Sequence, residues 1–152
     1  MLRTKVKNAC AYVRKYKFDW IWIDTCCIDK SSSAELSEAL NSMYKYYAEA
    51  RVCIVYLNDL EKSSNKATEL LSRLKECKWF TRGWTLQKLI APRYMVFLDQ
   101  EWERVSTRFT LRHFISEVTS IPVNVFEGPA LDDEKSQLGN YSIAQRMSWA
   151  AS

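Results

Sequence analysis

Short apolar runs that alternate with amphipathic segments constrain the fold of this chain more than any other feature. Runs rich in β-branched and aromatic residues predict buried strands at 18–24, 51–57 and 94–98. Apolar residues at helical spacing predict helices near 3–16, 34–49, 66–76, 79–91, 111–118 and 143–150. The order α-β-α-β-α-α-β-α-α favours an α/β fold, with a parallel sheet flanked by helices on both faces.

Local signals set where several elements begin and end. Ser32 and Glu35 have the spacing of a capping box, in which each side chain accepts a hydrogen bond from an amide at the start of a helix. Pro92 is expected to end the helix that begins near Trp79. Residues 121–139 carry Pro, Gly and acidic residues, which predicts a loop.

Composition narrows the class of protein. The chain has 152 residues, which fits one domain, and it is 47% hydrophobic, which is too apolar for a disordered chain. Its net charge of +4 comes from scattered basic residues, so we expect a solvated surface and no nucleic-acid partner. Without an apolar run of about 20 residues or an apolar N-terminal segment, we expect no membrane span, no signal peptide and a cytoplasmic location.

The cysteines do not form a recognisable metal motif. Five are present, none in a C-x-x-C pair, and His113 is the one histidine, so no metal site is predicted. We expect reduced thiols, because a bond between the neighbours Cys26 and Cys27 would close a strained ring. A nucleophile at Cys26 or Cys27 with His113 as base is the less favoured alternative.

Two carboxylates flank the loop after the first predicted strand. Asp24 ends that strand and Asp29 follows four residues later, and ligands bind at the carboxyl ends of strands in open parallel sheets. Both are therefore candidate ligand-binding residues. In the alternative interpretation, Asp24 caps a turn and Asp29 caps the next helix.

The segment from Trp79 to Ile90 carries a second set of candidates. Trp79 and Trp84 could each stack on a base or nicotinamide ring while Arg82 contacts a phosphate. In the alternative interpretation, the tryptophans pack in the core and Arg82 pairs with a surface carboxylate. Lys88, taken alone, is one lysine among many.

Several ordered motifs identify a family. They include Trp22-Ile-Asp-Thr-Cys-Cys-Ile-Asp-Lys30 and Trp79-Phe-Thr-Arg-Gly-Trp-Thr-Leu-Gln87, with further matches at 32–39, 41–44, 89–92 and 144–150. Over about residues 5–151 the chain resembles the heterokaryon incompatibility (HET) domain of filamentous fungi. The resemblance implies a role in non-self recognition and cell-death signalling, with the chain itself or other HET proteins as partners.

The same resemblance implies a fold and an activity. HET domains are distantly similar to Toll/interleukin-receptor (TIR) domains, which have a flavodoxin-like sheet. Some TIR domains cleave NAD, as a substrate rather than a cofactor, with a glutamate four residues after a helical tryptophan. In this chain Trp84 matches that tryptophan and Lys88 takes the position of the glutamate, while Gln87 joins the ligand-binding candidates.

Two departures from the family pattern qualify the expected activity. A cation at Lys88 would oppose the cationic ribosyl transition state, and loss of one stabilising group typically costs about 10²–10³ in rate. The family's first strand, with its Ser-His-x-Trp-Gly-like motif, and its C-terminal segment have no match, which predicts a single truncated domain over 1–152. We therefore expect weak or no NAD cleavage. The alternatives are a non-catalytic interaction module and a non-functional relic.

Overall fold

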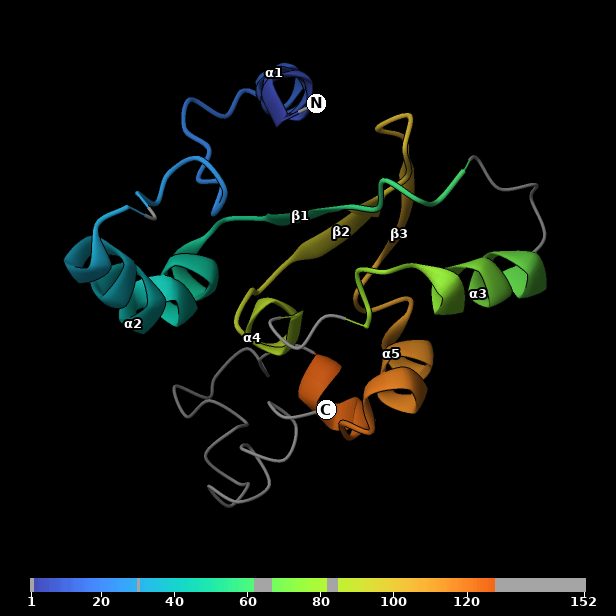
Figure 1. Ribbon diagram of the computed structural model, residues 1–152. Helices are drawn as coiled ribbons and strands as arrows, with labels where there is room; N and C mark the ends of the chain where they lie inside the picture. Colours follow the sequence, from blue (N-terminus) through green and yellow to red (C-terminus); the bar gives the residue numbers. More distant parts are fainter. Residues whose placement is uncertain (1, 30, 62–66, 82–84, 128–152) are drawn as a thin grey trace. The chain divides into compact units, whose positions relative to one another are not determined.

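The computed structural model describes residues 2–29, 31–61, 67–81 and 85–127 (Figure 1). The chain divides into two compact units, Met1–Met43 and Tyr44–Ser152. The predicted helix at 143–150, and most of the predicted loop at 121–139, lie outside the described residues.

The first unit is helical. Helix α1 spans Leu2–Lys15 and helix α2 spans Ser33–Glu49, close to the two helices predicted at 3–16 and 34–49. The strand predicted at 18–24 is wrong, because residues 18–23 are irregular and residue 24 begins a turn. Apolar character alone does not make a strand, which needs a partner for its backbone hydrogen bonds. Among the described residues no strand forms a sheet with this segment.

The start of α2 shows half of the predicted capping box. The Ser32 hydroxyl accepts a hydrogen bond from the Glu35 amide at 3.3 Å, as the motif requires. The Glu35 carboxylate does not return to Ser32, but accepts from the Asp29 amide at 3.1 Å. Glu35 thereby ties the preceding loop to the helix.

The second unit contains a three-stranded sheet in the order β1-β2-β3. Strands β1 (Cys53–Tyr56) and β2 (Met95–Leu98) are parallel, and both lie inside predicted strands. Strand β3 (Arg104–Thr107) pairs antiparallel with β2 and was not predicted. The expected all-parallel sheet is thus mixed, although the α/β class is confirmed.

Three helices of the second unit contribute to one apolar core with the sheet. They are α3 (Ala67–Glu76), α4 (Thr85–Ile90) and α5 (Arg112–Thr119), followed by the 3-10 helix η1 (Val123–Phe126). In Figure 1 the three α-helices lie on the same side of the strands. The core residues they share with the sheet include Val55, Leu74, Leu89, Phe97 and Ile115.

The segment predicted as one helix over 79–91 is shorter in the structure. Residues 79–81 form a turn, and the helix is α4, which ends at Ile90 two residues before Pro92. Among the described residues, no helix has the length and apolar character needed to cross a membrane.

Candidate functional site

Helix α4 carries Lys88, the residue on which the expected loss of NAD cleavage depends. Lys88 is half-buried, and its Nζ lies 5.8 Å from the centroid of the Tyr47 ring, which α2 supplies to the second unit. A cation over an aromatic face at this distance is attracted by the ring's quadrupole. The position at which the resemblance predicts a carboxylate therefore holds a lysine with an aromatic partner.

A buried arginine closes the end of this helix. Arg108 is 5% exposed, and its guanidinium donates to the carbonyls of Leu89 at 2.7 Å, Ile90 at 3.5 Å and Arg93 at 3.2 Å. The last carbonyls of a helix have no partner within the helix, and a cation there also complements the helix dipole. Burial lowers the pKa of Arg108. Arg108 fixes the C-terminal end of α4 beside Lys88.

Two aromatic residues before α4, Trp79 and Phe80, pack in or against the core. Trp79 meets Phe80 and Phe97 edge-on, with ring centroids 5.1 Å and 5.8 Å away. For Trp79 the packing interpretation is therefore confirmed. Arg82 and Trp84 lie outside the described residues, and the structure describes the backbone of Gln87 but not its side chain. Their assignment to a ligand-facing wall stays a prediction.

Asp24 and Asp29 lie in the first unit, on the loop between α1 and α2. Asp24 is half-buried at the start of a turn. Asp29 is exposed and accepts hydrogen bonds from the Ser31 hydroxyl at 2.6 Å and the Ser31 amide at 2.9 Å. These bonds, the hydroxyl first, hold the pKa of Asp29 below its usual value. These bonds lie before α2, and Ser32 rather than Asp29 accepts a hydrogen bond from an amide of the helix's first turn. The role of Asp29 in ligand binding stays a prediction.

Two exposed thiols lie on the same loop. The sulfurs of Cys26 and Cys27 are 4.0 Å apart, and neither residue is in a disulfide. Desolvation, and then the contact with Cys27, raises the pKa of Cys26. A raised pKa keeps a thiol protonated near neutral pH, which argues against a thiolate nucleophile at Cys26.

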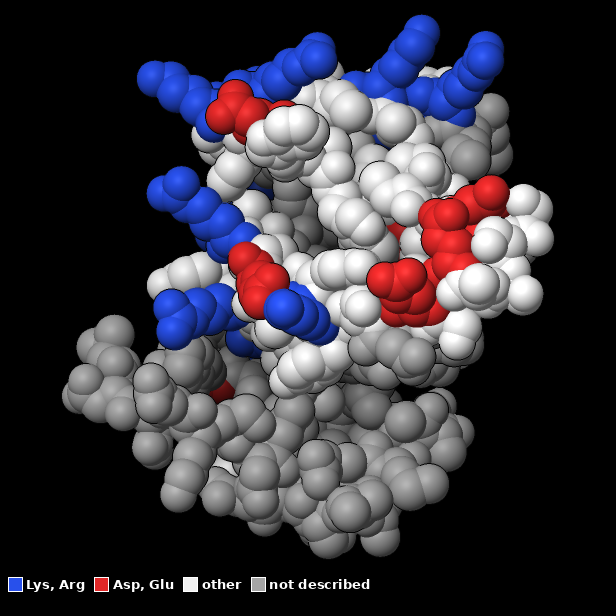
Figure 2. Space-filling model, turned by 90° about the vertical axis from the view of Figure 1, so that its left-hand side faces the viewer, with Lys and Arg blue, Asp and Glu red and all other residues white. Residues whose placement is uncertain are grey.

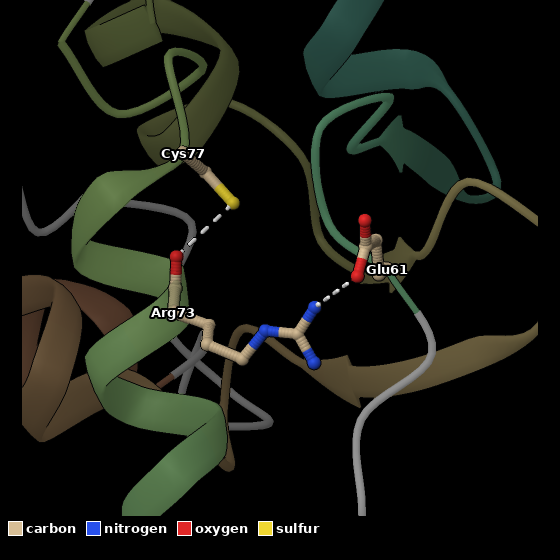
Figure 3. A network of polar contacts seen from close by, with 3 residues as sticks. All are labelled: Glu61, Arg73 and Cys77. Carbon is tan, nitrogen blue, oxygen red and sulfur yellow. Dashed lines mark hydrogen bonds and ion pairs between the residues drawn. The ribbon is translucent and has the colours of Figure 1, made fainter.

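A third thiol, Cys77, is structural. Cys77 follows α3 and donates to the carbonyl of Arg73 at 3.4 Å, while the Arg73 guanidinium reaches Glu61 at 3.5 Å (Figure 3). Burial raises the pKa of Cys77 to about 11. Within the described ranges, no group of three His, Cys, Asp or Glu side chains could hold a metal ion.

Asp99, a buried carboxylate that follows β2, is a residue that sequence reasoning missed. Asp99 is 3% exposed, and its Oδ1 accepts from the amides of Glu101 at 2.9 Å and Glu103 at 3.0 Å. Trp102, between them, has a φ of 65° and stacks on Tyr56 with ring centroids 4.4 Å apart. The turn that contains Asp99 and Trp102 therefore lies at the carboxyl ends of the two parallel strands, and its contacts stabilise the sheet. Spacing along the chain does not reveal such a role.

The surface charge follows the scattered pattern of the sequence, with one concentration. Helix α1 has five basic residues and no acidic one: Arg3, Lys5, Lys7, Arg14 and Lys15. Figure 2 shows Lys and Arg side chains gathered over the surface of this helix. Elsewhere on the visible face, acidic side chains gather on the right, and basic side chains lie on the left around an acidic one.

Comparisons with known proteins agree on one family. A family model described as heterokaryon incompatibility protein (HET) matches residues 1–75. The vegetative incompatibility protein HET-E-1 of Podospora anserina is 44% identical over 133 residues, which cover 86% of this chain. The matched region is 9% of that relative's length, so the relative is far longer than this chain. No solved structure matches the chain.

Proposed function

This chain belongs to the heterokaryon incompatibility (HET) family, and we propose that it is a module of fungal non-self recognition and cell-death signalling. The support is the 44% identity to a vegetative incompatibility protein, which extends across 86% of the chain. The family motifs at 22–30 and 79–87 fall inside the same domain-sized stretch.

For the activity, the contact between Lys88 and Tyr47 carries the proposal. In relatives with a glutamate at this position, a carboxylate would stabilise the positive charge that develops on the ribose as the nicotinamide bond breaks. Lys88 places a cation there, and its Nζ lies 5.8 Å from the Tyr47 ring centroid. Bringing a ribosyl cation to this position would set two positive charges against each other. The chain then cleaves NAD weakly or not at all.

NAD consumption by the purified chain tests this proposal. The unmodified chain is expected to match a buffer blank, and Lys88→Glu to gain turnover if the glutamate is the missing group. Lys78→Glu is the matched control, because Lys78 is an exposed lysine and the same charge change there should gain nothing. Robust turnover by the unmodified chain would sink the proposal.

An alternative function, favoured by the same contact, is a non-catalytic interaction module. Lys88 and Tyr47 join α4 to α2 within the second unit, which gives this position a packing role that needs no substrate. Such a module would assemble with itself or with other HET proteins. Size-exclusion chromatography with the matching region of HET-E-1 tests it. Co-elution supports assembly, and a chain that stays monomeric at every concentration contradicts it.

A further inference from the structure

Two exposed thiols lie side by side on the loop between α1 and α2. The sulfurs of Cys26 and Cys27 are 4.0 Å apart, and both side chains are exposed to solvent. Zn–S bonds are about 2.3 Å long, so two thiolates on one tetrahedral centre lie about 3.8 Å apart. The spacing of the two thiols is therefore close to that of a pair bridged by a single atom.

The backbone of Ile23 holds both thiols in this arrangement. The amides of Cys26 and Cys27 donate to the Ile23 carbonyl at 3.1 Å and 2.8 Å, which makes the turn compact. The Ile23 amide in turn donates to the sulfur of Cys27 at 3.3 Å, and the Cys26 thiol donates to the Ile23 carbonyl at 3.7 Å. A ligand thus meets two sulfurs that are already oriented, which reduces the entropic cost of binding.

The number of protein side chains that can bind at this turn limits which metal or metalloid it can hold. A structural zinc ion takes four protein ligands, and within the described residues no three His, Cys, Asp or Glu side chains could share an ion. A trivalent organoarsenic centre carries one carbon substituent and needs two sulfurs to complete its three bonds. Soft sulfur ligands suit such a soft centre. We propose that Cys26 and Cys27 form a two-thiol site for trivalent organoarsenic compounds.

The binding step is a condensation without electron transfer. An arsenic oxide, R–As=O, loses its oxygen, and arsenic forms one bond to each sulfur. The two thiol protons leave with the oxygen as one water molecule, so the oxidation state of arsenic and sulfur is unchanged. The product is a small ring that closes the turn between Asp24 and Asp29.

A disulfide is the competing fate of these thiols, and the geometry disfavours it. An S–S bond is about 2.05 Å long, so the sulfurs would have to approach from 4.0 Å and the turn would deform. A bridging arsenic atom accepts a spacing much nearer to the observed one.

Phenylarsine oxide is the probe, tested on the full chain by intact mass spectrometry. We expect one phenylarsenic adduct per chain that survives an excess of glutathione, a monothiol, and is removed by 2,3-dimercaptopropanol. In the chain without substitutions, the adduct should protect Cys26 and Cys27 from alkylation by iodoacetamide. Peptide mapping measures this protection. Protection of any other cysteine, or loss of the adduct to glutathione, would overturn the proposal.

Single substitutions locate the site. Cys26→Ser and Cys27→Ser should each weaken phenylarsine oxide binding by on the order of 100-fold, because the second bond is an intramolecular one. Cys10→Ser is the matched control, since Cys10 lies on α1 in the same unit and should leave binding unchanged. Undiminished binding by either loop variant, or an equal loss in Cys10→Ser, would contradict the proposal. Because both loop thiols are exposed, these variants are expected to keep the parent's thermal midpoint.

Discussion

The guanidinium of Arg108 donates to the carbonyl of Leu89 at 2.7 Å and so closes the C-terminal end of α4 from the end of β3. The backbone amide of Arg108 donates to the Met95 carbonyl at 3.1 Å, which holds the residue against β2. One residue therefore links the helix that carries Lys88 to the central strand of the sheet.

Removal of this guanidinium should destabilise the second unit. Arg108→Met keeps much of the apolar stem but leaves the carbonyls of Leu89 and Arg93 without their donor. A buried acceptor without a partner costs about 1–3 kcal/mol, so we expect a loss of about 2–4 kcal/mol in the free energy of unfolding. Urea unfolding followed by tryptophan fluorescence measures it. The control is Arg104→Met on exposed Arg104, which should change the free energy by less than about 0.5 kcal/mol. Equal stabilities of the two variants would contradict the assigned role.

The turn between β2 and β3 should depend on the carboxylate of Asp99. Asp99→Ala removes the acceptor of two amides in a buried position, and hydrogen bonds to a charged group are worth about 1.5–3 kcal/mol. We expect a loss of about 3 kcal/mol in the free energy of unfolding. Asp99→Asn keeps one oxygen, so the free energy of unfolding should fall by about half as much. Chemical denaturation measures both losses. Glu101→Ala, at an exposed neighbour, serves as the control and should lie close to the parent.

Glycine should be more stable than serine at position 120, which follows helix α5. Ser120 has a φ of 58° and a ψ of 17°, in the left-handed region where a Cβ is unfavourable. Ser120→Gly should raise the free energy of unfolding by about 0.5–1 kcal/mol, measured by thermal and urea denaturation. Ser106→Gly makes the same change within β3, where glycine weakens a strand, and should lower it. A loss of stability in Ser120→Gly would refute this reading of the helix end.

Helices were predictable from the chain where their apolar spacing is local. Helices α1 and α2 agree with the predicted bounds within one or two residues, because the signal depends on neighbours in sequence. Strand β3 was missed because Arg104–Thr107 is mostly polar and its pairing with β2 depends on the turn that Asp99 holds, which is not visible in the sequence. The strand expected at 18–24 failed for the converse reason, since an apolar run needs a pairing partner.

The candidate site was predictable only where a family motif marks it. The motif singled out Lys88 as the residue in the glutamate position, but the Tyr47 ring below it comes from a different helix. Arg108 and Asp99 act on backbone carbonyls and amides that many sequences could supply. Their roles follow from packing in three dimensions, which no spacing along the chain encodes.

The carboxyl group of Asp29 should titrate below its ordinary value. The Ser31 hydroxyl and amide donate to the ionised form, so the folded pKa lies below the ordinary value of 3.8 for an aspartate. The stability from these bonds is therefore present above pH 3.8 and is lost as the pH falls through the folded pKa. Carbon-detected NMR of the side-chain carboxyl measures the midpoint. Ser31→Ala removes the hydroxyl, the larger of the two causes, and should move the midpoint back toward 3.8. Thr25→Ala, another hydroxyl on the same loop, should leave it in place, and an unchanged midpoint in Ser31→Ala would show that the hydroxyl does not set it.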